Sequence, residues 1–162
     1  MTDITYIWTE EGWLYLAVVI DLFSRAVVGW ATSKRIIAEL VCLALQKAIV
    51  KRNPDSGLVL HSDRGIQYAC EEYRNLVNKY GLRQSMSRKG NCWDNAVAES
   101  FFRSLKVEAI KSYNLNTRRD AEERIFKYIE GFYNTRRAHS FLNYLSPMQF
   151  ELSGQTHLGL RR

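Results

Sequence analysis

The chain has 162 residues and a mass of 18.9 kDa, which suits one domain with a sizeable core. Its 46% hydrophobic and 25% charged residues exclude wholesale disorder, and its 9 glycines and 2 prolines exclude a linker-rich or collagen-like chain. The formal net charge of +6 favours a polyanionic partner; it is uneven, because residues 1–33 carry −3 and the remainder +9.

Membrane insertion and a disulfide framework are both disfavoured. The longest apolar run, residues 13–20, is much shorter than the roughly 18 residues that a transmembrane helix needs, and no basic-then-apolar leader precedes it. Cys42, Cys70 and Cys92 form neither a CxxC pair nor a zinc pattern with the histidines. We therefore expect a cytoplasmic protein with reduced thiols and no membrane partner.

The first third of the chain predicts an antiparallel meander and then a helix. Residues 2–8 alternate loosely, residues 13–20 are continuously apolar, and residues 26–31 are again apolar, which is the pattern of three strands joined by short turns. From 36 to 50 the hydrophobic period becomes helical. The expected inward residues of that helix are Ile37, Leu40, Val41, Ala44, Leu45, Ala48 and Ile49.

The middle of the chain predicts a strand, a helix and a last edge strand. The strand covers 58–60 and ends at the sequence HSDRG, and the edge strand covers 82–84. The helix covers 68–80, and Gly81 suits its C-terminal cap. Its expected inward residues are Tyr73, Leu76, Val77 and Tyr80. Residues 85–91 are polar and basic, so we expect a mobile loop there.

Two further helices are expected, from about 93 to 110 and from Thr117, which with Asp120 resembles a capping box. The second should bury Ala121, Ile125, Tyr128, Ile129 and Phe132. From Pro147 we expect a tail packed on the surface, with a core domain over 1–150 and a C-terminal tail over 151–162. The order predicts an α/β fold with a mixed five-stranded sheet flanked by helices.

Three acids occupy suggestive positions. Asp3 lies on the first strand, Asp63 follows the fourth, and Glu99 lies within an apolar helix. Three converging carboxylates repel one another, so such a site needs cations, and oxygen ligands suit Mg²⁺ or Mn²⁺. Two such ions can activate a water or a 3′-hydroxyl and stabilise the leaving oxygen of a phosphodiester. Taken singly, each acid is explained more simply as a solvated or capping carboxylate.

One face of the Glu99 helix also carries Asn95, Arg103 and Lys106, at spacings of four, four and three residues. Together with Arg88 and Lys89 in the preceding loop, these side chains suit phosphate contacts that do not depend on base sequence. The alternative is a solvated face with a weak Glu–Arg pair.

Five segments together resemble a known family. They are MTDITYI, GWLYLAVVIDLFSRAVVGW (12–30), HSDRGIQY (61–68), SMSRKGNCWDNAVAESFFRSLKVE (85–108) and FYNTRRAHSFLNYLSPMQFE (132–151). In this order they are similar to the integrase-type catalytic core of bacterial insertion-sequence transposases of the insertion-sequence-three kind. These transposases are relatives of retroviral integrases in the DDE superfamily.

The resemblance implies a ribonuclease-H-like fold and a catalytic, metal-binding triad of Asp3, Asp63 and Glu99. Asp63 and Glu99 have 35 residues between them, as the DDE pattern requires. It also implies two Mg²⁺ or Mn²⁺ ions, cleavage at transposon ends and strand transfer. Lys106 stands where the family has a basic residue that contacts donor DNA. Arg136 and Arg137 fall in a family motif, and either DNA contact or a basic helix C-terminus explains them.

The expected partners are DNA, as transposon ends and target, and further copies of the chain in a homodimer or higher oligomer. Family members usually carry an N-terminal helix-turn-helix region, whereas here Met1 stands two residues before Asp3. We therefore expect a separate recognition region or companion protein, and fraying of the first strand at Asp3. The alternatives are an inactive DNA-binding remnant and a ribonuclease-H-like nuclease. His61 is expected to support the Asp63 loop.

Overall fold

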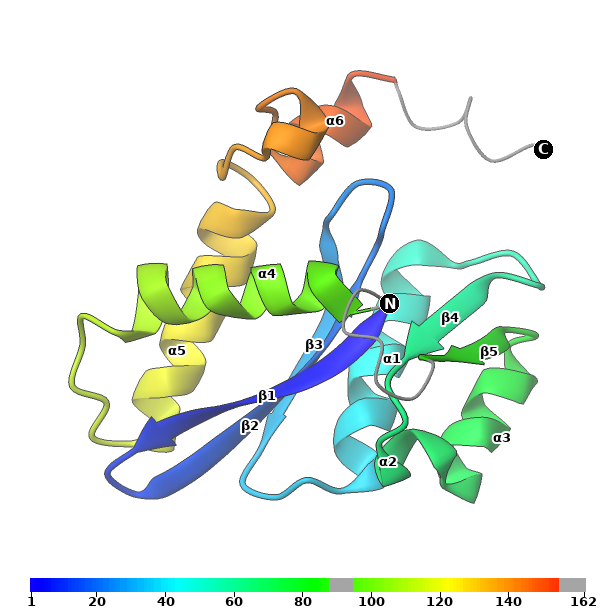
Figure 1. Cartoon of the computed structure of the whole chain (residues 1–162), viewed down its shortest axis with the longest axis horizontal. Coiled ribbons are helices and arrows are strands. Elements are labelled where there is room, and N and C mark those ends of the chain that lie inside the picture. The colour runs from blue at the N-terminus through cyan, green and yellow to red at the C-terminus, as the bar shows by residue number, and fades with distance from the viewer. Residues whose placement is uncertain (88–94, 155–162) are drawn as a thin grey trace.

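The computed structural model describes residues 1–87 and 95–154 (Figure 1). Among the helices of those residues, none is long and apolar enough to cross a membrane. The elements are β1 (Thr2–Thr9), β2 (Gly12–Ile20), β3 (Val27–Ser33), α1 (Ala38–Arg52), β4 (Val59–Ser62), α2 (Ile66–Ala69), α3 (Glu71–Lys79), β5 (Arg83–Met86), α4 (Ala96–Leu105), the π-helical turn η2 (Lys106–Ile110), α5 (Arg118–Tyr128), the π-helical turn η3 (Ile129–Tyr133), the 3₁₀ turn η4 (Ser140–Leu142) and α6 (Pro147–Leu152).

The predicted meander is confirmed. Strands β1, β2 and β3 form an antiparallel sheet in that order, with β2 in the middle. The apolar run of β2 is buried on both faces along most of its length, which is why it lacks the alternation of a half-exposed strand. Gly12 adopts φ +106 at the β1–β2 turn, a conformation that favours glycine.

The two remaining strands, β4 and β5, pair in parallel. Strand β4 contacts β1, so the five strands lie in one layer, hydrogen-bonded as a set of three and a set of two (Figure 1). The α/β architecture with a mixed set of strands is therefore as predicted.

Helices cover both faces of this layer. Helices α4 and α5 share one apolar cluster with β1 and β2, and α1 and α3 share a second cluster with the opposite face. Helix α1 packs so closely on β3 that a Cβ at Gly29 would collide with the backbone of Ala44. In Figure 1, α4 crosses the strands near the N-terminus of the chain.

The single helix expected over 68–80 is wrong. Cys70 is extended, with φ −69 and ψ 157, and separates α2 from α3. Tyr73 and Val77 are buried as predicted, but Tyr80 is 40% exposed because α3 ends at Lys79 and Tyr80 leaves the helical face. Gly81 follows with φ +64, as expected of a helix C-terminal cap.

The loop expected from residue 85 begins later. Ser85 and Met86 belong to β5, where they pair with His61 and Ser62, and Ser87 is buried. The polar sequence does not signal this strand, because its stability comes from backbone hydrogen bonds to β4. Residues 88–91 of the expected loop lie outside the described residues.

The C-terminal helices are confirmed, including the capping box of Thr117 and Asp120. Phe132, expected to be buried, is 41% exposed, because the wider π-helical turn η3 rotates it away from the core. Ile37, also expected inward, precedes α1 and is 38% exposed. The expected tail begins instead with helix α6, which has a capping box of Ser146 and Gln149.

Candidate active site

Asp3 is held in a regular strand. It lies opposite Val18, and its own carboxylate accepts a hydrogen bond from the backbone N–H of Ile4 at 2.8 Å. Met1 is buried, and its backbone exchanges hydrogen bonds with Ile20 at 2.7 and 2.9 Å. Strand β1 is therefore hydrogen-bonded to β2 from its first residues.

Asp63 lies one residue beyond the end of β4. Its Oδ1 accepts a hydrogen bond from the backbone N–H of Gly65 at 2.8 Å, which closes a tight turn. A Cβ at Gly65 would meet the movable end of the Gln67 side chain and would lie 3.0 Å from Asp63 Oδ1. The turn fixes where the Asp63 carboxylate stands at the carboxyl end of the strand.

Glu99 is exposed on α4, a helix whose opposite side is fully packed. Ala98, Phe101, Phe102 and Leu105 are buried in the cluster shared with β1 and β2. Helix α4 contacts β1 directly. The packing of the apolar side therefore directs Glu99 away from the core, on the helix that crosses the strand of Asp3.

The charges of Asp63 and Glu99 act on the carboxylate of Asp3. Burial, together with the negative charges of Asp63 and Glu99, raises the pKa of Asp3 to about 6, against the lowering effect of the Ile4 hydrogen bond. Like charges within interaction distance disfavour ionisation. The structure thus brings the three acids of the predicted triad into one electrostatic neighbourhood, where a bound cation would relieve their repulsion.

The donor set suits Mg²⁺ or Mn²⁺, which prefer carboxylate oxygens. Over residues 1–87 and 95–154, however, no three His, Cys, Asp or Glu side chains lie close enough together to form a metal-binding group. The acids therefore have the right chemistry and interact, but they do not form a closed coordination sphere.

A hydrogen-bond cluster, which the sequence did not reveal, centres on Ser87. Its hydroxyl lies 3.2 Å from His61 Nε2, 3.1 Å from Asn95 Oδ1 and 3.2 Å from the Ser62 carbonyl oxygen. Its own carbonyl accepts a hydrogen bond from Arg64 Nε at 2.8 Å. We call His61, Ser62, Arg64, Ser87 and Asn95 the Ser87 cluster. It ties the end of β4, just before Asp63, to the start of the Glu99 helix.

The Ser87 cluster contains two residues that were predicted from the sequence, His61 and Asn95. His61, expected to support the Asp63 loop, does so through Ser85 and Ser87, at 3.1 and 3.2 Å. Asn95, expected to contact DNA, is half-buried and engaged with Ser87. No pattern of residue types marks Ser87, since its partners come together only in the fold.

The predicted basic residues differ in their surroundings. Arg103 is exposed on α4. Lys106 is half-buried, its Nζ lies 4.9 Å from the centre of the Tyr6 ring, and burial lowers its pKa. Arg88 and Lys89 lie outside the described residues.

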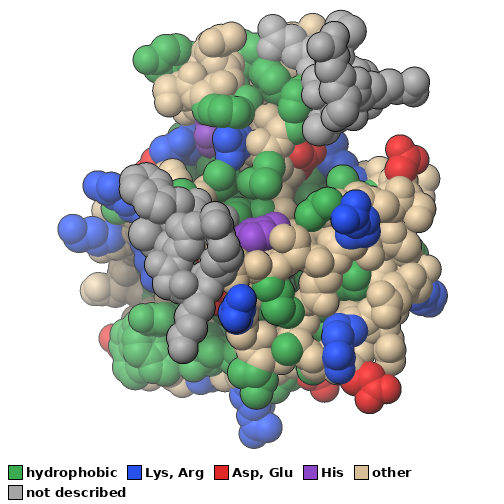
Figure 2. Space-filling view, turned by 45° about the vertical axis from the view of Figure 1, so that its right-hand side comes forward, with side chains coloured by type: hydrophobic (Ala, Val, Ile, Leu, Met, Phe, Trp, Pro, Cys, Tyr) green, Lys and Arg blue, Asp and Glu red, His purple; other side chains and the backbone are tan. Residues whose placement is uncertain are grey.

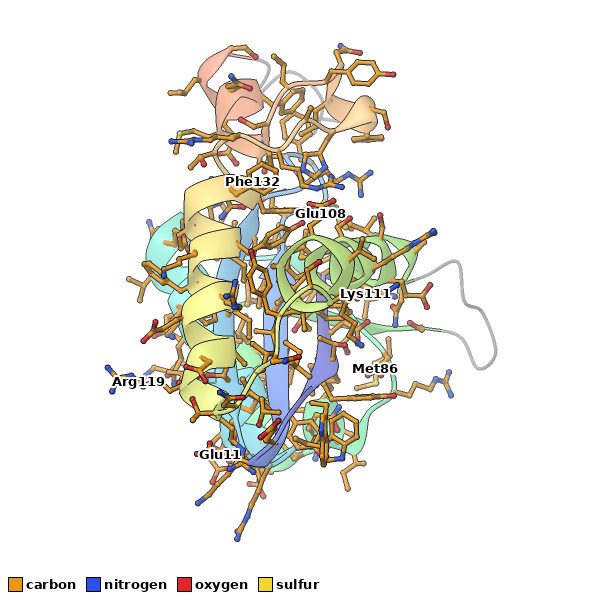
Figure 3. The ribbon with its side chains drawn as sticks, turned by 90° about the vertical axis from the view of Figure 1, so that its left-hand side faces the viewer. Glu11, Met86, Glu108, Lys111, Arg119 and Phe132 are labelled. Carbon is orange, nitrogen blue, oxygen red and sulfur yellow. The ribbon has the colours of Figure 1, made fainter. Side chains whose placement is uncertain are left out.

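Arg136 and Arg137 also differ. Arg136 is exposed, whereas the Arg137 guanidinium pairs with Glu108 at 2.7 Å and donates to Ser104 at 3.1 Å. Tyr128 donates a further hydrogen bond to Glu108 at 2.8 Å. The Arg137 guanidinium holds the pKa of Glu108 below its usual value. Figure 3 shows Glu108 near the same end of α5 as Phe132, so this ion pair joins η2 to the segment after α5.

The fold is ribonuclease-H-like and of the integrase type, with acids on β1, just after β4 and on α4. The family model described as integrase core domain matches residues 1–92, and a second integrase core domain model matches residues 80–147. The chain belongs to the integrase core domain family.

Curated relatives are insertion-sequence transposases. The chain is 52% identical over 149 residues to the transposase InsF for insertion sequence IS3A of Escherichia coli (strain K12), covering 92% of this chain and 52% of the relative. It is 50% identical over 149 residues to the transposase for insertion sequence element IS904 of Lactococcus lactis, covering 92% of this chain and 59% of the relative. The chain thus spans between half and three-fifths of the length of these relatives.

Solved structures share the fold. A simian T-cell lymphotropic virus intasome in complex with PP2A regulatory subunit B56 gamma matches with a TM-score of 0.76 at 19% identity, over 99% of this chain and 54% of that chain. The HTLV-2 integrase catalytic core domain in complex with magnesium, in a trimeric form, matches with a TM-score of 0.70 at 17% identity, over 92% of each chain.

Proposed function

We propose that this chain is the catalytic core of a transposase, which cuts DNA at transposon ends and joins the freed 3′-hydroxyl to target DNA. The observation that carries the proposal is the placement of Asp3 on β1, Asp63 just after β4 and Glu99 on α4, close enough for the charges of Asp63 and Glu99 to act on Asp3. The family membership and the transposases that share about half of its residues support the same reaction. We take the core to cover residues 1–150, followed by a tail over 151–162.

Asp3, Asp63 and Glu99 would hold Mg²⁺ or Mn²⁺, and we propose two ions, as phosphodiester transfer commonly uses. The magnesium bound to the HTLV-2 core supports this choice of metal. When bound, such ions activate a water or a 3′-hydroxyl and stabilise the leaving oxygen.

The protein's own part is to position and to hold charge. Asp3 must lose its proton before it can act as a ligand, since a carboxylic acid is a poor one. The turn at Gly65 and the Ser87 cluster fix Asp63 and the start of the Glu99 helix. Arg103 and Lys106, on the helix of Glu99, would bind the phosphates of the DNA strand, and Arg88, Lys89, Asn95 and Arg136 remain proposed DNA contacts.

The proposed partners follow from the same reaction. They are the two transposon ends, target DNA and further copies of this chain, with a homodimer or higher oligomer bringing both ends together. The trimeric and dimeric forms of the HTLV-2 core support oligomerisation. A helix-turn-helix region or a companion protein would recognise the ends. The place of action would be the cytoplasm, on DNA.

The test is Mg²⁺-dependent nicking and joining of oligonucleotides that carry the element's ends. We expect both activities from the chain, with the end-recognition region supplied if needed, and loss of both in Glu99→Gln. Glu123→Gln, an exposed acid on α5, is the matched control and should leave both unchanged. Nicking without any joining would instead indicate a nuclease, and DNA binding with neither would indicate an inactive remnant. Full activity in Glu99→Gln would overturn the site assignment.

A further inference from the structure

Three aromatic side chains are exposed together on the β1–β2 hairpin. Tyr6 is 55% exposed, Trp8 59% and Trp13 42%. Their ring centres lie 5.1 Å apart for Tyr6 and Trp13, and 4.8 Å apart for Trp8 and Trp13. We call these three residues the aromatic hairpin patch. Figure 2 shows hydrophobic side chains gathered at the lower left, the end of the molecule where the hairpin lies.

The patch exposes ring surface that the fold does not use. Its rings meet at steep angles, 85° and 74°, so they contact one another by their edges rather than in a stack. Such large aromatic groups are usually buried, and a contiguous exposed group of them commonly marks a binding surface. The exposed faces are suited to a planar ligand.

The hairpin is held rigidly. Arg118, at the start of α5, donates to the carbonyl oxygens of Glu11 at 2.6 Å and Trp13 at 3.1 Å. The backbone N–H of Glu10 donates to the Leu115 carbonyl at 3.0 Å. Figure 3 shows Glu11 and Arg119 at the same end of the molecule. Because the hairpin is already ordered, a ligand would not have to order it on binding.

A cation connects the patch to the helix of the acidic triad. Lys106 Nζ lies 4.9 Å from the Tyr6 ring centre, and Arg103 is exposed one turn earlier on α4. Glu99 precedes Lys106 by seven residues, about 10 Å along a helix. Asp3 precedes Trp8 by five residues, about 17 Å along a strand. Lys106 therefore links the patch to the continuous helical segment that carries Glu99, while Asp3 faces the other side of β1 from Tyr6 and Trp8.

We propose that the aromatic hairpin patch and Lys106 bind an unpaired segment of the DNA strand that leads away from the acidic triad. Bases stack on the exposed rings, and Lys106 contacts the backbone phosphates. Aromatic platforms beside cations are the usual means of binding single strands, and stacking tolerates any base. The inference rests on the proposed function, because it identifies the ligand at this surface as the strand held at the triad.

The experiment measures binding of the full chain to a fluorescent unpaired oligothymidine and to a blunt duplex, in the presence of a metal chelator. For Trp8→Ala we expect affinity for the unpaired strand to fall about tenfold or more, the size expected for loss of one stacked base. Affinity for the duplex should change less than twofold. Trp8→Phe should retain most of the affinity, because a ring remains.

The matched control is Phe126→Ala, which removes an aromatic side chain of similar exposure, 56%, from α5. It should leave both affinities unchanged. Lys106→Gln should lower the affinity for both the unpaired strand and the duplex. It should also reduce the slope of log affinity against log salt concentration by about one. Far-ultraviolet circular dichroism of each variant checks that the fold is retained.

Unchanged binding of the unpaired strand by both Trp8→Ala and Trp13→Ala would overturn the proposal. So would an equal loss for strand and duplex, or a change from dimer to monomer with DNA affinity unaltered, which would assign the patch to a second copy of the chain. Because binding is measured without metal, its outcome is separate from the nicking and joining test. A chain that neither nicks nor joins but binds the strand through Trp8 would refute the proposed function alone.

Discussion

Asp3 and Glu108 are two carboxylates in opposite surroundings. Glu108 receives hydrogen bonds from Arg137 and Tyr128, and its pKa is lowered. Asp3 is half-buried near two further acids, and its pKa is raised to about 6. Glu108 is neutralised by Arg137, a cation that the chain itself supplies, whereas Asp3 is not neutralised in this way. Glu108 thus belongs to a structural ion pair, whereas the charge at Asp3 suits the binding of a cation from outside the chain.

Asp3→Asn should give the largest effect and the sharpest contrast. Removal of one ligand should lower the nicking rate by roughly a thousandfold or more, since metal stabilisation is worth several kcal/mol. The same change removes a half-buried charge that Asp63 and Glu99 repel, so the metal-free protein should gain about 1–3 kcal/mol of stability at pH 7. Strand-nicking assays and denaturant unfolding with a chelator measure both quantities. A less stable Asp3→Asn protein would contradict the electrostatic account.

The pH dependence of stability should have opposite signs for the two carboxylates. The folded pKa of Asp3 exceeds its usual value of 3.8, so the folded state holds the extra proton and metal-free stability falls as pH rises from about 4 to about 6. Glu108 has a lowered folded pKa, so its contribution is present above its usual value of 4.5 and is lost as pH falls below that value.

The difference in unfolding free energy between wild type and Asp3→Asn isolates the contribution of Asp3. His139, whose pKa burial lowers to about 4, adds a loss of stability as pH falls from about 6.5, but it is present in both proteins and cancels. Denaturant unfolding with a chelator at several pH values should show the two proteins converging below about pH 4. Parallel curves would contradict the raised pKa of Asp3. Mg²⁺ affinity of the wild type should fall about tenfold per pH unit below about 6.

Arg137→Ala should cost about 1–2 kcal/mol of stability, because it leaves the partly exposed Glu108 without its cation. Arg136→Ala, at an exposed neighbour, should stay within about 0.5 kcal/mol. Chemical denaturation measures both. The opposite result, unchanged stability with weakened DNA binding in Arg137→Ala, would assign Arg137 to the DNA interface.

Ser87→Ala should give the smallest effect, about 1 kcal/mol of stability, for the loss of a buried hydroxyl with several partners. Because the cluster links the end of β4 to the start of α4, we also expect a modest rise in the Mg²⁺ concentration that gives half-maximal nicking. Ser100→Ala, on the exposed side of α4, is the control. An unchanged Mg²⁺ requirement would limit Ser87 to a purely structural role.

The sequence predicted the elements whose signals are local. The apolar run of β2, the period of α1 and the capping box at Thr117 all depend on neighbouring residues, and all three are found. The break at Cys70 and the extension of β5 to Met86 depend on tertiary hydrogen bonds and packing, which no local pattern records.

The candidate site divides in the same way. The positions of Asp3, Asp63 and Glu99 came from motif order and the 35 residues between the last two. The effect of the Asp63 and Glu99 charges on Asp3 depends on the fold and is not marked in the sequence. Arg137 looked like its neighbour Arg136 in sequence, but its ion pair with Glu108 bridges 29 positions. Lys106 was singled out on its helix, and its contact with Tyr6 joins residues 100 positions apart.

The hairpin turn that Arg118 clamps has a consequence for the whole of β1. A strand shifted by one residue turns every side chain to the opposite face. Asp3 and Trp8 occupy opposite faces of β1, since they are five positions apart. One residue inserted between Thr9 and Gly12 would leave the sequence of β1 unchanged. If the pairing of β1 with β2 slipped by one residue as a result, a neighbour of Asp3 would take its position beside Asp63 and Glu99. A turn at the far end of the strand therefore sets the alignment of Asp3 with Asp63 and Glu99.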